Sequence, residues 1–307
     1  MEYSGVVIKS TGSWYTVDTG DNIVNCRIKG RFKISDIKTT NPVAVGDKVK
    51  FIMIENDDAG LITEILPREN FIIRKATKLS KSSHIIASNI DRCIVIATVA
   101  KPKTSTGFID RLLTTAEAYH IPSIIVFNKY DLYDEEELAR LHHLIKMYYS
   151  VGYPVIITST KTNKGLDKFK HALQNKVSLL TGHSGVGKSA LINCIQPNLN
   201  LKEGEISQTY EKGKHTTTFA TMYKLTFGGY IIDTPGIKEF GLTNFDRAEV
   251  ADRFPEMRKY RNKCKFNNCT HTNEPDCAVL EAVAKNEIYE ERYINYLNIL
   301  EDDYFDE

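Results

Sequence analysis

The chain has 307 residues, 42% of them hydrophobic, and a net charge of +1 from 40 basic and 39 acidic side chains. These values are ordinary for a soluble globular protein, exclude a disordered chain or a fibre, and leave room for about two domains. The clearest apolar run, 94–100, is far shorter than the ~20 residues of a membrane-spanning helix. No signal peptide is evident at the start, so we expect a cytoplasmic protein with no membrane association.

Residues 1–69 contain about five short strand patterns separated by turn residues. These patterns lie at 5–9, 14–17, 23–28, 48–52 and 61–65. So many short strands in so few residues predict an all-β barrel of the OB type, with a two-sheet sandwich as the alternative.

A row of basic residues occupies every second position of one predicted strand. The row consists of Arg27, Lys29, Arg31 and Lys33. Period two places all four side chains on one face, where they could follow the phosphates of a nucleic acid while Trp14, Tyr15 and Phe32 stack on bases. A solvated strand face is the alternative interpretation.

Residues 70–90 carry several lysines and serines and no acidic residue, which indicates a mobile basic linker. From 91 to 242, buried-strand patterns alternate with helical ones, as in a parallel sheet with helices on both faces. Strands are expected at 93–97, 123–127, 154–157, 177–180 and 230–232, and helices at 108–119, 135–149 and 165–174. Residues 243–307 predict a small helical domain with helices at 246–263 and 278–300.

A phosphate-loop motif, G-x-x-x-x-G-K-[ST], follows the strand expected at 177–180 and precedes a helix. Its residues are Gly182, His183, Ser184, Gly185, Val186, Gly187, Lys188 and Ser189. Glycines let backbone N–H groups turn toward phosphate oxygens, and the helix N-terminus adds its positive dipole end. Lys188 would reach the β- and γ-phosphates, and Ser189 would be a ligand of Mg²⁺.

An N-K-x-D motif, formed by Asn128, Lys129 and Asp131, follows the strand expected at 123–127. Its carboxylate can accept hydrogen bonds from N1–H and the exocyclic amine of guanine, a donor pair that adenine lacks. Together with a phosphate loop this motif indicates GTP rather than ATP. Ser159 follows the next expected strand, where a loop that supports the base would lie.

Two further segments complete the predicted nucleotide site. Asp233 and Gly236 belong to a D-x-x-G sequence after the strand at 230–232, where Asp233 can hold Mg²⁺ through water and the Gly236 N–H can contact the γ-phosphate. Thr217 is the favoured switch threonine for Mg²⁺, and His215 is the favoured catalytic group. Ile237 stands where Ras-like GTPases have a water-orienting glutamine, so intrinsic hydrolysis should be slow.

The order of these motifs is unusual. In an ordinary small GTPase the phosphate loop comes first, whereas here N-K-x-D at 128 and Ser159 precede the loop at 182. This indicates a circular permutation, which leaves the ligand loops at the same sheet edge. The switch segments then lead directly into residues 243–307, and we infer that nucleotide state is relayed to that domain.

Four metal-binding side chains fall within fourteen residues. They are Cys264, Cys269, His271 and Cys277. Three thiolates and an imidazole form a full tetrahedral shell with no open position, which predicts one structural zinc ion. A basic cluster at 258–265 runs into this site, and together with the basic strand and linker it makes structured RNA the expected partner.

The predicted barrel, the permuted GTPase motifs and the Cys-Cys-His-Cys cluster together resemble the RsgA (YjeQ) family of small ribosomal subunit biogenesis GTPases. The resemblance covers essentially the whole chain. It implies a cytoplasmic GTP hydrolase, here expected to be a monomer, that binds the maturing small ribosomal subunit and its rRNA and is stimulated by that particle. In the family a histidine is expected shortly after a Phe-Gly-Leu sequence, and this chain has Asn244 there, so His183 and Asn244 join His215 as candidates for the water-orienting role.

Two other functions are compatible with the sequence. One is a nucleotide-gated RNA-binding module whose GTP hydrolysis is too slow to matter. The other is a permuted GTPase that acts on tRNA or in a membrane process, although no basic amphipathic helix or lipidation motif supports the membrane version.

Overall fold

The computed structural model describes residues 1–28, 42–55, 57–74, 84–201, 220–233 and 247–301. The chain divides into two compact units. One comprises Met1–Cys93, Lys170–Thr181 and Ser189–Glu239, and the other comprises Ile94–Phe169, Gly182–Lys188 and Phe240–Glu307. Among the described helices none is both long and apolar enough to cross a membrane.

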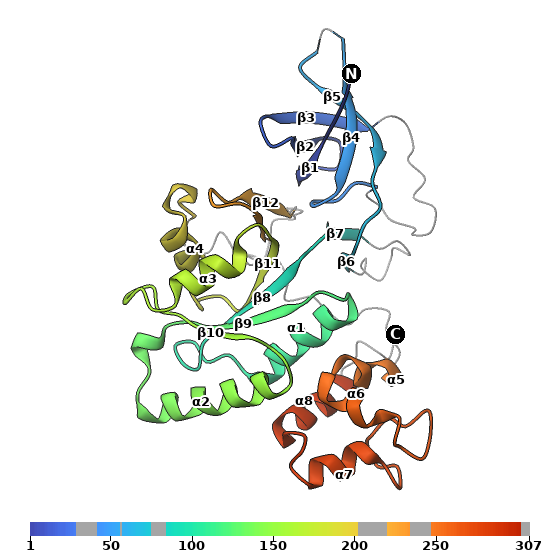
Figure 1. Cartoon of the computed structure of the whole chain (residues 1–307), viewed down its shortest axis with the longest axis vertical. Coiled ribbons are helices and arrows are strands. Elements are labelled where there is room, and N and C mark those ends of the chain that lie inside the picture. The colour runs from blue at the N-terminus through green and yellow to red at the C-terminus, as the bar shows by residue number, and fades with distance from the viewer. Residues whose placement is uncertain (29–41, 56, 75–83, 202–219, 234–246, 302–307) are drawn as a thin grey trace, which may run out of the picture. The chain divides into compact units, whose positions relative to one another are not determined.

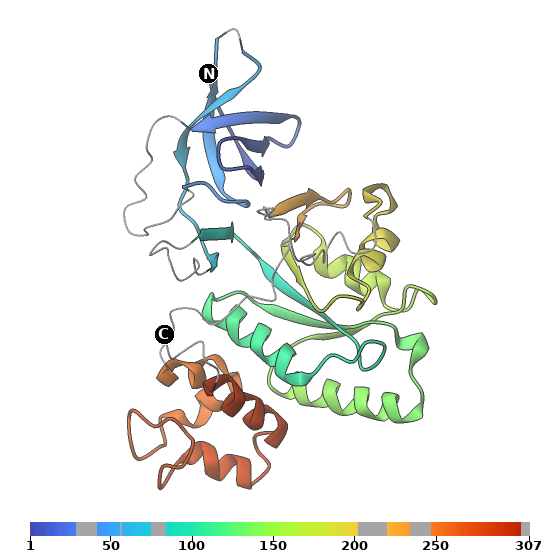
Figure 2. The same ribbon diagram turned by 180° about the vertical axis from the view of Figure 1, so that it is seen from behind.

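The first unit begins with a closed five-stranded barrel (blue in Figures 1 and 2). Its strands are β1 (Glu2–Ser10), β2 (Tyr15–Asp18), β3 (Ile23–Ile28), β4 (Lys48–Met53) and β5 (Gly60–Ile65). They pair in the order β1-β2-β3-β5-β4, and β4 pairs back onto β1. The barrel prediction is therefore confirmed over the sandwich alternative.

Alternation of side chains explains the barrel core. Along β4, Val49 and Phe51 are buried while Lys48 points to solvent, because successive strand residues face opposite sides of the sheet. The buried residues of this core are Val7, Tyr15, Val17, Cys26, Val43, Val49, Phe51 and Ile62.

The segment predicted to be a mobile linker is partly a hairpin. Strand β6 (Phe71–Arg74) pairs antiparallel with β7 (His84–Ser88), and this corrects the prediction for these described residues of 70–90. The hairpin is tied to the barrel because Ser88 and Arg68 both donate hydrogen bonds to the fully buried carboxylate of Asp47, at 2.6 and 2.7 Å. A basic composition alone could not reveal these pairings.

The barrel is continuous with a second group of strands in the same unit. Strand β11 (Val177–Thr181) is parallel to β13 (Tyr230–Asp233), which is antiparallel to β12 (Thr221–Lys224). Lys9 of β1 pairs with Thr221 of β12. Asp18 strengthens this joint, since its carboxylate accepts hydrogen bonds from Tyr230 at 3.0 Å and Lys224 at 3.2 Å.

The second unit contains the rest of the alternating pattern. Four of its elements lie wholly within it: α1 (Thr106–Ala118), β9 (Ser123–Phe127), α2 (Glu135–Ser150) and β10 (Val155–Ile157). Three further elements are divided between the two units, namely β8 (Arg92–Ala97), α3 (Leu166–Leu173) and α4 (Lys188–Ile195). β9 and β10 are parallel, with Ile125 opposite Val155. α2 begins with a reciprocal capping box in which Asp134 and Glu137 bond each other's backbone N–H groups. These elements agree with the sequence pattern to within two residues.

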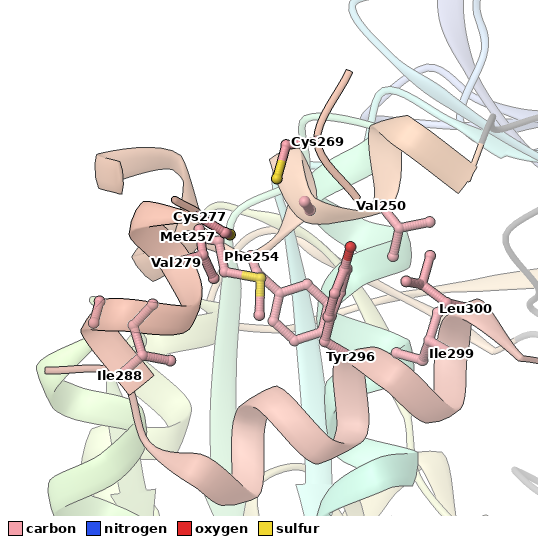
Figure 3. Close-up of a cluster of buried hydrophobic side chains, with 12 residues drawn as sticks. Val250, Phe254, Met257, Cys269, Cys277, Val279, Ile288, Tyr296, Ile299 and Leu300 are labelled. Carbon is pink, nitrogen blue, oxygen red and sulfur yellow. The ribbon is translucent and has the colours of Figure 1, made fainter. Parts of the chain in front are cut away.

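The C-terminal helices are shorter than predicted. They are α5 (Arg247–Val250), α6 (Pro255–Arg261), α7 (Ala278–Ala284) and α8 (Glu290–Leu300). Pro255 disfavours helical backbone at Phe254, so the helix expected at 246–263 is interrupted there. The helix expected at 278–300 breaks after Ala284, where Asn286 adopts a positive φ of 59°. The buried side chains of these helices pack around Phe254, Met257 and Tyr296 (Figure 3).

We predict that Asp18→Asn lowers the stability of the first unit by about 1 kcal/mol, because it removes an ion pair with a half-exposed lysine and hydrogen bonds at a buried position. Burial alone would raise the pKa of Asp18, but bonds from Gly20, Lys224 and Tyr230 lower it below 3.8. The wild-type advantage should thus be complete at neutral pH, begin to fall near pH 3.8, and disappear as the pH falls further through the lower pKa of folded Asp18.

Thermal unfolding of the two proteins across a pH series measures this difference. Asp21→Asn, which changes an exposed carboxylate in the adjacent turn, is the matched control. Equal melting temperatures for wild type and Asp18→Asn at pH 7 would contradict the assignment.

Candidate functional site

The loop from Gly182 to Lys188 connects β11 to α4, as the motif predicted. Gly182 and Gly187 have positive φ angles of 148° and 95°. A Cβ at Gly182 would lie 2.2 Å from the Ile96 carbonyl oxygen, and one at Gly187 would lie 2.5 Å from Nδ2 of Asn128. Close backbone approach therefore requires glycine at both positions.

Lys188 is held against this loop. Its ammonium donates hydrogen bonds to the carbonyl oxygens of Gly182 and His183, both at 2.8 Å. The side chain is only 5% exposed. The loop thus fixes one positive charge at a defined point beside its own backbone.

Asn128 joins the N-K-x-D segment to the loop. Its Nδ2 donates to the Val186 carbonyl at 2.9 Å, and its Oδ1 accepts from Oγ1 of Thr158 at 3.0 Å. Asn128 and Thr158 are both buried. The N-K-x-D segment therefore contacts the phosphate-loop motif, although it comes before that motif in the chain.

The neighbouring residues of the motif are also positioned. Lys129 has a positive φ of 63°, and its ammonium donates to the Lys101 carbonyl at 2.7 Å. Ser159 Oγ donates to Oδ1 of Asp131 at 2.5 Å, which connects the predicted base-support loop to the predicted base-reading carboxylate.

Two residues of this region were not identified from the sequence. Tyr133 donates to the Asn128 carbonyl and accepts from the Val99 N–H at 3.0 Å, and burial raises the pKa of its hydroxyl to about 12, so it stays protonated and able to donate. Lys164 lies with its ammonium 3.2 Å from the centre of the Tyr130 ring. Neither residue belongs to a motif, and only the fold brings them to the site.

Several predicted residues cannot be placed. Thr217, His215, Gly236, Ile237, Asn244, Lys29, Arg31 and Lys33 lie outside the described residues. Asp233 is described as the last residue of β13.

The four predicted metal ligands form one cluster. Their ligand atoms all lie within 4.8 Å of one another. Sγ of Cys264 is 3.5 Å from Nδ1 of His271 and 3.9 Å from Sγ of Cys277, and His271 Nδ1 is 3.3 Å from that sulfur. Tetrahedral zinc with Zn–S bonds of about 2.3 Å needs ligand separations of about 3.8 Å, so this donor set fits the ion.

Burial makes uncompensated thiolate charge unfavourable in this cluster. Burial raises the pKa of Cys269 to about 12, and it also raises the pKa of Cys277. Burial lowers the pKa of His271, which keeps its imidazole neutral and able to ligate. A divalent cation would replace the thiol protons and compensate the thiolate charges.

Side chains around the cluster fix its loop. The Glu274 carboxylate accepts from the Thr272 N–H at 2.9 Å and from the Thr270 hydroxyl at 2.6 Å. Partial burial would raise the pKa of Glu274, but the Thr270 and backbone hydrogen bonds lower it to about 2. The Tyr293 hydroxyl of α8 donates to the His271 carbonyl at 2.8 Å, which connects the cluster to the C-terminal helices.

Helix α8 is also bonded to α1. The fully buried Asp110 of α1 accepts from Arg292 at 2.5 Å and from Asn295 at 2.6 Å, and Arg292 also donates to Glu256 at 2.7 Å. Although desolvation disfavours the charge on Arg292, its two carboxylate partners raise its pKa well above the ordinary value. No local pattern in the sequence indicated this network.

The basic cluster at 258–265 is largely paired with acidic residues. Arg258 bonds Glu117 at 2.8 Å, Arg261 bonds Asp252, and Lys265 bonds Asp276 at 2.8 Å. These contacts favour an exposed, charge-balanced surface over the free basic patch that the sequence suggested. On the barrel, Arg27 lies over the Trp14 ring at 4.1 Å. Tyr15 cannot stack on a base as predicted, because its side chain is buried in the barrel core, and Phe32 lies outside the described residues.

The hydrogen bond between Asn128 and Val186 brings the N-K-x-D segment and the phosphate-loop motif together, although the chain contains these motifs in the reverse of the usual order. The class of protein is thus a circularly permuted P-loop GTPase. More particularly, the chain belongs to the RsgA GTPase family: the model of that family matches residues 65–243, and the RsgA N-terminal domain model matches residues 4–62.

Relatives and solved structures agree with this assignment. The chain is 52% identical to "Small ribosomal subunit biogenesis GTPase RsgA 2" of Bacteroides thetaiotaomicron, over 97% of this chain and 96% of the relative. It is also 52% identical to "Small ribosomal subunit biogenesis GTPase RsgA" of Phocaeicola vulgatus, with the same coverage. The structure is similar to that of YjeQ from Thermotoga maritima, with a TM-score of 0.79 and 33% identity over 98% of both chains. It is also similar to YloQ, described as a circularly permuted GTPase, with a TM-score of 0.74 and 29% identity over 98% of this chain and 94% of YloQ.

We predict one tightly bound Zn²⁺ per chain, lost on Cys269→Ser. Because metal binding contributes directly to folding in so small a domain, residues beyond 246 should become protease-sensitive when the ion is removed. Elemental analysis and limited proteolysis measure both effects. Cys194→Ser, which changes an exposed cysteine on α4, should keep its zinc. Absence of zinc from wild-type protein purified without chelator would refute the prediction.

Proposed function

We propose that this GTPase binds the maturing small ribosomal subunit and its rRNA, assists late assembly of that particle, and hydrolyses GTP faster when docked on it. The main support for GTP binding is the hydrogen bond from Asn128 to the phosphate loop, because it places the segment proposed to recognise the base beside the segment proposed to bind the phosphates. The names of the relatives, small ribosomal subunit biogenesis GTPases, support the ribosomal part.

Guanine is recognised by Asp131 in this proposal. One carboxylate oxygen of Asp131 accepts from the Ser159 hydroxyl, which orients the group toward the base. Two donors on guanine match a carboxylate, because both of its oxygens accept. Asn128 and Lys129 hold the loop around the base, since their side chains bond the Val186 and Lys101 carbonyls.

The phosphates lie in the loop from Gly182 to Ser189. Lys188 supplies positive charge to the β- and γ-phosphates, where charge develops during transfer. Ser189 and Thr217 are the proposed Mg²⁺ ligands, with Asp233 acting through water, and the ion would neutralise phosphate charge. The Gly236 N–H contacts the γ-phosphate.

Water activation is assigned to His215. Ile237 has no group that can orient water, so slow intrinsic turnover and stimulation by a docked partner follow from the sequence.

The domains take separate roles. Residues 1–69 form the rRNA-binding barrel, with Arg27 and the row that continues through Lys29, Arg31 and Lys33 facing the phosphates. Residues 70–90 connect it to the GTPase at 91–242, and 243–307 form the structural zinc domain. The protein acts in the cytoplasm as a monomer.

Asp131→Asn should shift nucleotide preference from GTP toward xanthosine triphosphate, because an amide donates where the carboxylate accepted. GTP affinity should fall by about tenfold or more, as expected for an unpaired buried polar group. Equilibrium titration with both nucleotides measures the change. Asp167→Asn, at an exposed position of α3, is the matched control. Unchanged GTP affinity in Asp131→Asn would refute the guanine assignment.

Purified small subunits should raise GTP turnover by about tenfold or more, whereas large subunits and tRNA should not. Stimulation by tRNA alone would favour the tRNA-directed GTPase, and no stimulation by any particle would favour the RNA-binding module with negligible catalysis.

A charge-reversed barrel is the matched variant in this experiment. Changing the row to Arg27→Glu, Lys29→Glu, Arg31→Glu and Lys33→Glu should weaken cosedimentation with small subunits and make its salt dependence shallower, because fewer counterions are released. Intrinsic turnover should be unchanged. Normal binding and stimulation in this variant would show that the row is a solvated strand face.

A further inference from the structure

A pair of stacked aromatic rings lies beside the phosphate loop. The imidazole of His183, the second residue of that loop, packs on the Phe108 ring with centroids 3.6 Å apart and planes inclined by 22°. Phe108 does not belong to any nucleotide motif. Stacking at this distance fixes the orientation of both rings.

The backbone of His183 is part of the lysine-binding geometry. Its carbonyl oxygen is one of the two that accept from the Lys188 ammonium, at 2.8 Å. The stack with Phe108 anchors the His183 side chain and so restrains the Cα and the backbone carbonyl of the same residue. Loss of the stack would free this backbone to shift, and the ammonium would lose a fixed acceptor.

Phe108 is itself held at the beginning of α1. Its backbone N–H donates to Oγ of the capping residue Ser105 at 3.2 Å. Two residues further along α1, Asp110 is buried and bonded to Arg292 and Asn295 of α8. The ring that contacts the phosphate loop is therefore carried by a helix that is also hydrogen-bonded to α8.

A cavity of about 370 Å³ brings these groups together. Phe108 and His183 line one part of it, and Asn295, Asn298 and Ile299 of α8 line another. α8 thus borders the stacked pair directly. A displacement of α8 would alter the space into which either ring could turn.

We propose that Phe108 and His183 are positioning residues for GTP hydrolysis, which hold the Lys188 ammonium in place and make that placement depend on the docking of α8 against α1. The inference rests on the proposed contact of Lys188 with the nucleotide phosphates. In this role the two rings act through Lys188, separately from any contact that the His183 backbone makes with the phosphates. Because the lysine charge matters most where charge develops during transfer, loss of the pair lowers kcat more than it changes KM.

The test compares Phe108→Leu, which keeps an apolar side chain but loses the aromatic stack, with Phe108→Tyr, which keeps it. Phe108→Leu should lower kcat about tenfold with a change in KM of less than about threefold, and Phe108→Tyr should retain most of the activity. His183→Ala should reproduce the Phe108→Leu effect. The double variant should be no slower than either single variant, because the two changes remove one shared interaction.

The controls separate a positioning role from a structural one. Tyr149→Leu, which removes a largely exposed aromatic ring of α2, should leave both constants unchanged. Melting temperatures identify any variant that fails to fold. If Phe108→Leu does not fold, His183→Ala compared with His183→Phe, which restores a ring, decides the question by loss and rescue.

Lys188→Ala distinguishes the failure of the inference from the failure of the proposed function. Normal turnover in Lys188→Ala would defeat the phosphate-loop assignment itself. Loss of turnover in Lys188→Ala with wild-type kcat in the folded ring variants would overturn only the positioning role. Additive losses in the double variant would also overturn it, because independent effects do not require a shared contact.

Discussion

One buried amide, that of Asn128, holds the candidate nucleotide site together. Asn128 is 1% exposed, so each of its polar atoms must find a partner within the protein, and it finds them in the Val186 carbonyl and the Thr158 hydroxyl. Loss of such a partner costs about 1–3 kcal/mol. The bond also explains Gly187, since any Cβ there would collide with the same amide. A permuted chain can build this site because the bond depends on which strand ends meet, and does not depend on the order in which the chain reaches them.

The C-terminal helices depend on two kinds of long-range contact. A zinc ion held by the Cys-Cys-His-Cys cluster would supply folding energy that so small a hydrophobic core lacks, and the hydrogen bond from Tyr293 to His271 connects the cluster to α8. The buried Arg292 then connects α8 to α1. Charges at this depth stabilise the fold only when fully paired, and Asp110 and Glu256 provide that pairing. The position of α8 relative to α1 is thereby restricted to one hydrogen-bonded arrangement.

The sequence predicted features that local patterns encode. Period-two alternation indicated the five barrel strands, and motifs with fixed spacing indicated the phosphate loop, the N-K-x-D segment and the metal cluster. It could not predict contacts between distant side chains, such as Asp110 with Arg292 or Phe108 with His183, because neither partner carries a local signal. The same limit applies to the basic cluster at 258–265, because its composition could not show that Arg258 pairs with Glu117, far away in the chain. It also explains one error: the segment before Ile90 was predicted to be a mobile linker because composition does not reveal strand pairing.

The junction between β1 and β12 has a consequence for solubility. A strand at the end of a sheet presents unpaired backbone N–H and C=O groups that can recruit another chain. Pairing of Lys9 with Thr221 covers that edge of β12 with the barrel. The barrel therefore protects the sheet that contains β12 from self-association. A GTPase fragment produced without its first 70 residues would expose the unpaired backbone of β12 and tend to aggregate, even if its nucleotide site were intact.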